Sequence, residues 1–364
     1  MRRVPRRMIA FLTGFLVGFG GLAVAGAMLP YAIPFEPFRR FPRDLAPQTL
    51  FYPTAAHIEA LTLSRFVEGR TMVIIGGNSI LRGVGQHTGT EWSAELSRLL
   101  GDKFTVLNLA ANGGWVSGYG YTAARLLLKQ GKPVIFIANL PSGFRADGHP
   151  FYRNFYYDAL VAGLLPRSAD REMAPTLSPE DQRERQELLI RAWTNRLFHT
   201  DDLWTTLGYC CFFTTWTRLT ANGPWMARRD RPDPDAAPFP HYSMTDADME
   251  VVHRVANQVR WLLPDQVATL LPPDIAKRTI FAITGESPFY LPRLSEEERK
   301  KMDASRADAV TVVEAAGAHA VIVGELTADD FIDHTHLSPR GGRALAQAVA
   351  PVVRRVAEEE GYPR

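Results

Sequence analysis

Cysteine is nearly missing from this chain of 364 residues, which has only two, the adjacent Cys210 and Cys211. Neighbouring cysteines pair poorly with each other, and two thiols cannot supply a zinc ribbon, so a disulfide framework and a cysteine zinc site are excluded. P-loop, HExxH and CxxC motifs are also absent. We interpret the two cysteines as buried apolar thiols, and the sequence predicts neither a cofactor nor a metal.

The chain also lacks an excess of charge, with a formal net charge of +2. Residues 1–43 hold seven arginines and one glutamate, so the rest of the chain carries a net charge of −4. No block of Lys or Arg interrupts this mildly acidic part. The electrostatic footprint of a nucleic-acid-binding protein is therefore missing, and a neutral or weakly charged substrate is expected.

One long stretch has no charged residue at all, from Met8 to Phe35, and four arginines precede it. This length spans a bilayer, and the basic leader predicts a cytoplasmic N-terminus. Residues 1–35 are therefore expected to be a single-pass anchor in the inner membrane, with the body periplasmic. Ala25-Gly26-Ala27 resembles a signal-peptidase site, so a cleaved signal peptide is the alternative, and both interpretations export the body.

Small residues line one face of this span, because Gly14, Gly18, Gly21 and Ala25 recur at helical spacing. Such a face lets another membrane helix approach closely, which predicts a possible multi-span membrane partner. The alternative is that glycine is simply frequent in membrane spans.

Five short apolar runs in the body read as buried parallel strands, and helical patterns separate them. The runs are Met72–Ile75, Phe104–Leu109, Val134–Asn139, Thr279–Ile283 and Ala320–Val323. Helices are expected at Glu91–Leu100, Tyr121–Lys129, Ser305–Ala316 and Pro339–Glu359. The alternation predicts an α/β fold, a three-layer α/β/α sandwich on a five-stranded parallel sheet.

We expect a linker over residues 36–70 and one domain over residues 71–364. Residues 142–277 break the alternation and are mostly helical in pattern, so we interpret them as an insertion. Because the insertion follows the carboxyl end of the third strand, it is expected to overhang the place where open α/β sheets bind ligands.

A serine follows the first strand directly, in Ile75-Gly76-Gly77-Asn78-Ser79. Two glycines permit a sharp turn, and backbone N–H groups beside such a serine can hold a developing oxyanion. Ser79 is therefore a candidate nucleophile. The alternative is that it only caps a helix.

A second candidate lies in Asp333-His334-Thr335-His336, on the loop that enters the last helix. An aspartate three residues before a histidine can accept the imidazole Nδ1–H and leave Nε2 free to take a proton from serine. This spacing favours His336, with His334 as the second choice. The two histidines could instead bind zinc, although no further ligand cluster completes such a site, or form a solvated pair.

Oxyanion donors are expected at two further strand ends. Asn108 to Gly114 follow the second strand, and Asn139 ends the third. A glycine N–H and an asparagine side-chain N–H from these segments could join the Ser79 N–H around one carbonyl oxygen.

In order and spacing, Gly77-Asn78-Ser79, Asn108 through Gly113, and Asp333-x-x-His336 resemble the motif blocks of the SGNH/GDSL hydrolase family. The resemblance covers roughly residues 72–139 and 278–357. It implies a flavodoxin-like sheet and a triad of Ser79, Asp333 and His336. It also implies an oxyanion hole of Ser79, Gly113 and Asn139. The third block departs from the family's Gly-x-Asn-Asp, since this chain has Ala138-Asn139-Leu140-Pro141.

The resemblance further implies cleavage or transfer of an ester acyl group through an acyl-serine. We expect a membrane-tethered, extracytoplasmic esterase acting on an O-acylated, most simply O-acetylated, envelope glycan. The alternatives are an O-acyltransferase working with a multi-span acyl-transporting partner, and a non-catalytic envelope scaffold with the same fold.

Overall fold

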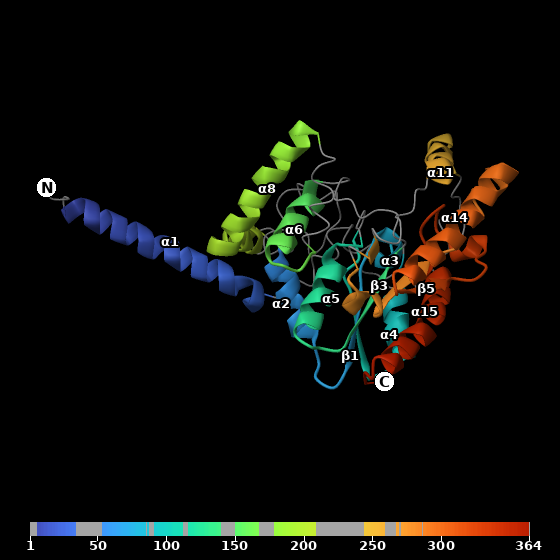
Figure 1. The fold of residues 1–364 in the computed structure, drawn as a ribbon, viewed down its shortest axis with the longest axis horizontal. Coiled ribbons are helices and arrows are strands. Elements are labelled where there is room, and N and C mark those ends of the chain that lie inside the picture. The colour runs from blue at the N-terminus through green and yellow to red at the C-terminus, as the bar shows by residue number, and fades with distance from the viewer. Residues whose placement is uncertain are drawn as a thin grey trace, which may run out of the picture.

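The computed structural model describes residues 6–33, 53–84, 86, 91–111, 116–139, 150–166, 178–208, 244–258, 267–268, 271–285 and 287–363. These residues form an α/β fold around one five-stranded, all-parallel sheet, as the sequence predicts (Figure 1). The strand order is β2-β1-β3-β4-β5, the doubly wound order of a flavodoxin-like sheet. The expected three-layer α/β/α architecture is therefore confirmed.

The strands lie within one residue of the bounds expected from the apolar runs. They are β1 (Thr71–Ile75), β2 (Phe104–Asn108), β3 (Val134–Ala138), β4 (Thr279–Ile283) and β5 (His319–Ile322). Every residue of β1, β3 and β4 is buried. Continuous apolar runs fit this position, because a central parallel strand is covered on both faces.

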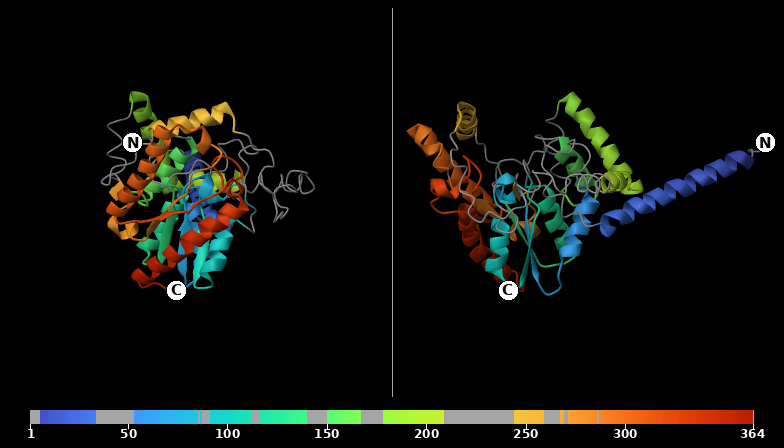
Figure 2. Two further views of the ribbon diagram at one scale, coloured as in Figure 1. Left: turned by 90° about the vertical axis from the view of Figure 1, so that its right-hand side faces the viewer. Right: turned by 180° about the vertical axis from the view of Figure 1, so that it is seen from behind.

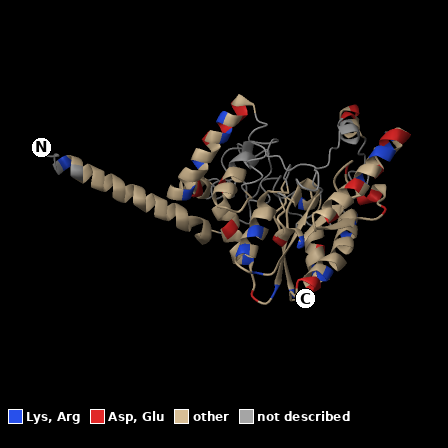
Figure 3. Ribbon diagram, viewed as in Figure 1, with Lys and Arg blue, Asp and Glu red and all other residues tan. Residues whose placement is uncertain are grey.

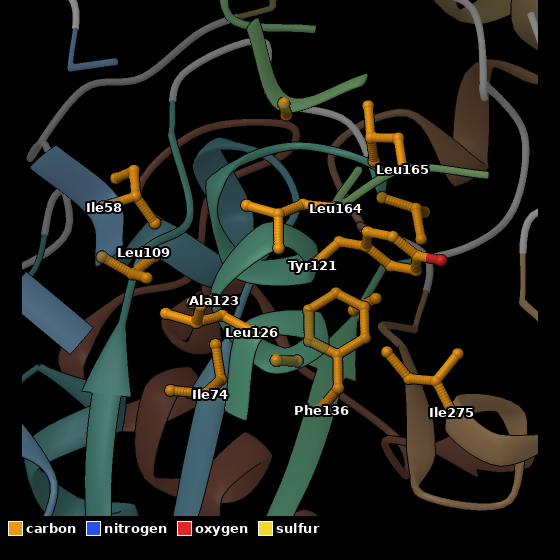
Figure 4. Packing of buried hydrophobic residues seen from close by; sticks show 14 of the residues in the cluster. Ile58, Ile74, Leu109, Tyr121, Ala123, Leu126, Phe136, Leu164, Leu165 and Ile275 are labelled. Atoms are coloured by element: carbon orange, nitrogen blue, oxygen red, sulfur yellow. The ribbon is translucent and has the colours of Figure 1, made fainter. Parts of the chain in front are cut away.

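Helices cover both faces of the sheet. One face packs against α2 (Ala55–Arg65), α5 (Tyr119–Lys129) and α6 (Pro150–Val161), and the other against α4 (Trp92–Leu100) and α15 (Pro339–Glu359). Figure 4 shows the first interface, where the ring of Tyr121 meets that of Phe136 edge-on at a centroid distance of 6.0 Å. Alternate residues of each strand thus enter two separate cores.

Part of the expected linker is a helix of the domain. Residues 55–65 form α2, which begins with a capping box between Thr54 and His57 and buries Ile58 and Leu61 against the sheet helices. The domain therefore begins before residue 71, and residues 55–65 of the linker expected over residues 36–70 are a helix packed on the domain. Residues 34–52 lie outside the described part.

One helix is longer than its apolar pattern indicated. The expected helix at Ser305–Ala316 is the C-terminal part of α14 (Glu296–Ala315). Its first turns are solvated and held by a capping box of Ser295 with Glu298 and by Lys–Glu pairs four residues apart. Charge pairs stabilise this segment in place of an apolar stripe, so the apolar pattern of the sequence did not predict its first turns. The short elements are α3 (Ser79–Arg82), α13 (Pro273–Ala276), η4 (Leu291–Arg293) and η5 (Ala328–Asp330).

The described parts of residues 142–277 are mostly helical, as expected: α6, α8 (Pro179–Phe198), residues 200–208, α11 (Asp246–Gln258) and α13. Figures 1 and 2 place α6 and α8 at one end of the sheet and α11 beside α14 at the other. The described helices thus flank the sheet. The rest of the insertion, with Cys210 and Cys211, lies outside the described residues.

A single helix, α1 (Arg6–Ala32), projects from the domain (Figure 1). Its residues 10–32 are long and apolar enough to cross a membrane, and Figure 3 shows no charged residue along this stretch. Its C-terminal half contacts α2 and α8, so this half of the helix packs against one side of the domain.

Candidate active site

The serine and histidine singled out in the sequence meet at the carboxyl ends of the strands, although 257 residues separate them. Ser79 opens α3 directly after β1, and His336 lies on the loop that leads into α15. The His336 Nε2 and the Ser79 Oγ are 2.9 Å apart, within hydrogen-bond distance. This is the separation that general-base activation of a serine requires.

Asp333 holds the histidine from the other side. Its Oδ2 lies 2.7 Å from the His336 Nδ1, and its Oδ1 accepts the N–H groups of Thr335 and His336, both at 2.7 Å. Partial burial raises the pKa of Asp333, but these hydrogen bonds outweigh it and lower that pKa to about 2. A carboxylate ionised at every pH of interest keeps the histidine proton on Nδ1, so Nε2 faces serine as an acceptor.

The loop that carries both residues is clamped at its base. Phe331 and Leu337 form an isolated antiparallel bridge and are both buried in the second core. The Ser338 N–H donates to the Asp330 carbonyl at 2.9 Å, while the Ser338 hydroxyl caps α15. Asp333 and His336 therefore project from a fixed hairpin.

Ser79 is placed by the turn before it. Gly77 has φ +95°, and a Cβ there would collide with the side-chain oxygen of Asn139. Asn78 then caps α3, since its side chain accepts the Ile80 N–H at 3.0 Å. Ser79 is thus the first residue of a helix and not its cap, so the helix-cap interpretation of Ser79 is wrong.

The far end of α3 is fixed by two buried donors. The indole N–H of Trp92 and the side-chain amide of Asn108 both donate to the Leu81 carbonyl, at 2.7 and 2.9 Å. Asn108 also accepts the Ala110 N–H at 3.1 Å. The second motif block therefore supports the short helix that carries Ser79.

Asn139 lies beside the serine turn. Its Oδ1 accepts the Asn78 N–H at 2.8 Å, which turns its Nδ2 to the other side of the amide. Within the described part of the chain, neither this Nδ2 nor the Ser79 N–H has a hydrogen-bond acceptor. Both can donate to a substrate oxygen. Gly113, the other expected donor, lies outside the described residues.

Sequence reasoning missed Gln86, which joins the two halves of the site. Its side-chain amide donates to the Leu337 carbonyl at 3.2 Å and accepts the Trp92 N–H at 2.7 Å. It therefore ties the segment after α3 to the hairpin of His336. A lone glutamine in a loop has no distinctive spacing, so no sequence signal marks it.

The structure brings His336, and not His334, to the serine. In the described ranges, no group of three or more His, Cys, Asp and Glu side chains could hold a metal ion. Other histidines serve structure: His57 is fully buried between Thr54 and Thr206, and His199 contacts Asp202.

No protein-family model matches the chain, and no curated protein matches it. The interpretation of the site therefore rests on the sequence blocks and the geometry above.

Proposed function

We propose that this protein is a membrane-tethered serine enzyme that cleaves or transfers an ester-linked acyl group on an extracytoplasmic glycan, most simply an acetyl group. The observation that carries the proposal is the chain of contacts from Asp333 through His336 to Ser79, at 2.7 and 2.9 Å. Resemblance to the SGNH/GDSL blocks supplies the reaction class.

In the first half of the reaction, the His336 Nε2 takes the proton from the Ser79 Oγ as that oxygen attacks the ester carbonyl. The tetrahedral intermediate then collapses, the alcohol leaves with the proton from Nε2, and the acyl group stays on serine. Asp333 stabilises the imidazolium that forms between the two proton transfers.

In the second half, water or a sugar hydroxyl gives its proton to Nε2 and attacks the acyl-serine. The bond from the acyl carbon to the Ser79 Oγ then breaks, Oγ takes the proton back from Nε2, and the acyl group leaves as the free acid or the new ester. The Ser79 N–H and the Asn139 amide are placed to stabilise the oxyanion of both tetrahedral intermediates, with Gly113 as the expected third donor. One such donor is typically worth about 10²- to 10³-fold in kcat.

The test uses the full chain in detergent micelles with a fluorophosphonate probe and acetylated model esters. We expect the probe on Ser79, an acyl-enzyme at Ser79 by mass spectrometry, and loss of both signals in Ser79→Ala. Ser64→Ala, which removes an exposed hydroxyl on α2, is the matched control and keeps both. Labelling of Ser79→Ala at the wild-type rate would overturn the proposal.

A transferase with a membrane partner is the second candidate, favoured by the exposed glycines of α1. A Cβ on Gly14, Gly18 or Gly21 would meet nothing within 4 Å. At about 100° per residue, this face points roughly 120° away from the face of α1 that contacts the domain, so a partner helix has access to it. Co-purification of a multi-span protein that is lost in Gly14→Leu/Gly18→Leu would favour transfer over hydrolysis.

A serine and histidine out of hydrogen-bond reach of each other would favour the scaffold alternative. Their 2.9 Å contact supports the enzyme instead.

A further inference from the structure

Large apolar side chains lie exposed on α8 and on the helical residues 200–208 that follow it. We call this set the α8 apolar surface, and its members are Ile190, Trp193, Leu197, Phe198, Trp204 and Leu207. Ile190, Leu197 and Trp204 are each at least 65% exposed. Burying such side chains stabilises a protein, so leaving several of them exposed to water is unfavourable.

The opposite face of the same helices carries polar groups into the domain. Asn195, Asp202 and Thr206 are buried there, and the Asn195 amide bridges Asp158 and Asp202 at 3.1 Å each. The largest apolar side chains of a surface helix in a soluble domain face the core, whereas on α8 only the small Ala192 and two partly buried leucines do so. Because the buried side is already hydrogen-bonded, rotation of α8 cannot hide the apolar side chains.

The α8 apolar surface is continuous with α1. The ring of Phe198 packs edge-on against that of Phe19, with centroids 5.1 Å apart, and Phe19 stacks on Phe15 at 6.1 Å. Phe19 lies well inside the apolar stretch of residues 10–32. A bilayer that surrounds α1 at the depth of Phe19 therefore reaches the end of α8.

From this continuity we propose that the α8 apolar surface is embedded in the leaflet on the domain side of the membrane that α1 crosses. Figures 1 and 2 show α8 crossing the direction of α1, as expected of a helix lying in the membrane plane. Tryptophan favours the interface between headgroups and acyl chains, where Trp193 and Trp204 would lie.

The charges on α8 fit this environment. Its acidic residues all lie in the first half, and from Leu188 to Phe198 the only charged residues are Arg191 and Arg196, of which Arg191 pairs with Asp201 of the following segment at 2.7 Å. Arginines beside an apolar face suit the headgroup layer of an anionic bilayer. The proposal depends on insertion of α1 in a membrane and is independent of the chemistry at Ser79.

The test is fluorescence quenching in phospholipid vesicles that contain the full chain and no other protein. The signal of interest is the difference between the wild type and Trp193→Phe/Trp204→Phe, since that difference isolates two of the seven tryptophans. Lipids brominated along the acyl chain quench a tryptophan only when it lies in the membrane. We expect this difference to fall about twofold or more in brominated vesicles relative to ordinary ones.

The matched control adds Ile322→Trp to the double variant. Ile322 is half exposed on β5, on the side of the sheet away from α1, and a tryptophan there should show no quenching (Figure 1). Circular dichroism checks that each variant is folded. If Trp193 and Trp204 are quenched no more than the tryptophan at 322, the proposal is overturned, as it would be if the surface is covered by a partner's helices or by a second copy.

Discussion

The strand-end region around Ser79 and the membrane-side region around α8 use tryptophan in opposite ways. Trp92 is fully buried, and its indole N–H holds the Leu81 carbonyl beneath the serine. Trp193 and Trp204 are 49% and 70% exposed on α8 and the helix after it. In the first region the tryptophan is part of the core. In the second region two tryptophans of a kind that a soluble domain usually buries are exposed on the surface.

This difference indicates that the two regions of the chain suit two environments, water around the sheet and lipid around α8. Around the sheet, apolar side chains are inside, and the polar groups of the candidate site collect at the strand ends. Around α8, the buried side holds several hydrogen-bonded polar groups, and the largest apolar side chains are exposed.

The largest effect is expected at the site. Asp333→Asn should keep the bonds from the Thr335 and His336 N–H groups, but its NH₂ would donate to the His336 Nδ1 and force the wrong tautomer. We expect kcat on a model ester to fall by about 10⁴-fold, with little change in thermal stability. Ester turnover measures kcat, and the melting temperature measures stability. A fall in kcat of less than tenfold would contradict the role of Asp333 in fixing the His336 tautomer.

Gly77→Ala should act on both activity and stability. The substitution forces a non-glycine residue to φ +95° and drives its Cβ into Asn139. Loss of the Asn139 position should lower kcat by about 10²-fold or more. Gly69→Ala is the control, because Gly69 has a similar φ of +76° with nothing within 4 Å. It should cost only about 1–2 kcal/mol of stability and leave kcat unchanged. Equal kcat in the two variants would sink this explanation.

In the region around α8, the protonation of Asp158 should make the stability of the protein depend on pH. Burial raises its pKa from 3.8 to about 6, even though the Ala55 N–H and the Asn195 amide donate to it. A raised pKa means that the folded state holds the proton more tightly. Its contribution is therefore fully present below about pH 4 and is lost as the pH rises through about 6.

Relative to Asp158→Asn, the wild type should thus lose about 3 kcal/mol of unfolding free energy between pH 4 and pH 7, the equivalent of a pKa rise of roughly two. Urea unfolding in micelles at several pH values measures this difference. A wild type that gains on the variant as the pH rises would show that the sign is wrong. Buried His57, with its pKa lowered to about 3 by burial, changes stability in the opposite direction and cancels in the comparison.

The smallest effects compare the tryptophans directly. Trp92→Phe should cost about 2 kcal/mol, through lost volume and the lost hydrogen bond to Leu81. Trp193→Phe should change stability by less than about 0.5 kcal/mol in micelles. Thermal unfolding of both variants measures the contrast, and equal losses would mean that α8 is packed like the core.

The sequence predicted the sheet and the pairing of Ser79 with His336 because their signals are local. Buried strands are continuous apolar runs, and a serine after a strand or an Asp-x-x-His loop can be read within a few residues. The carboxyl ends of parallel strands then bring distant loops to one edge. The described residues bear out the expected sheet to within a residue at each strand end.

Other features depend on residues that are close in space but far apart in the sequence, so no short stretch of the sequence predicts them. The helix α2 lies behind a proline-rich stretch, and only the capping box of Thr54 and His57 marks its start. Gln86 acts through two contacts with distant partners. The exposed face of α8 has the same helical spacing as a buried one, so its direction becomes visible only when the domain beneath it is known.

The hairpin that carries Asp333 and His336 changes how the site can vary. Base and carboxylate share four consecutive residues, closed by the Phe331–Leu337 bridge, so they move as one rigid piece. The three side chains are therefore aligned when two segments, the hairpin and the turn at α3, are correctly placed relative to each other. Gln86 contacts both sides of the joint between these segments. A small displacement at that joint would separate Ser79 from an intact His–Asp pair, which gives the fold a way to disarm the site without altering its residues.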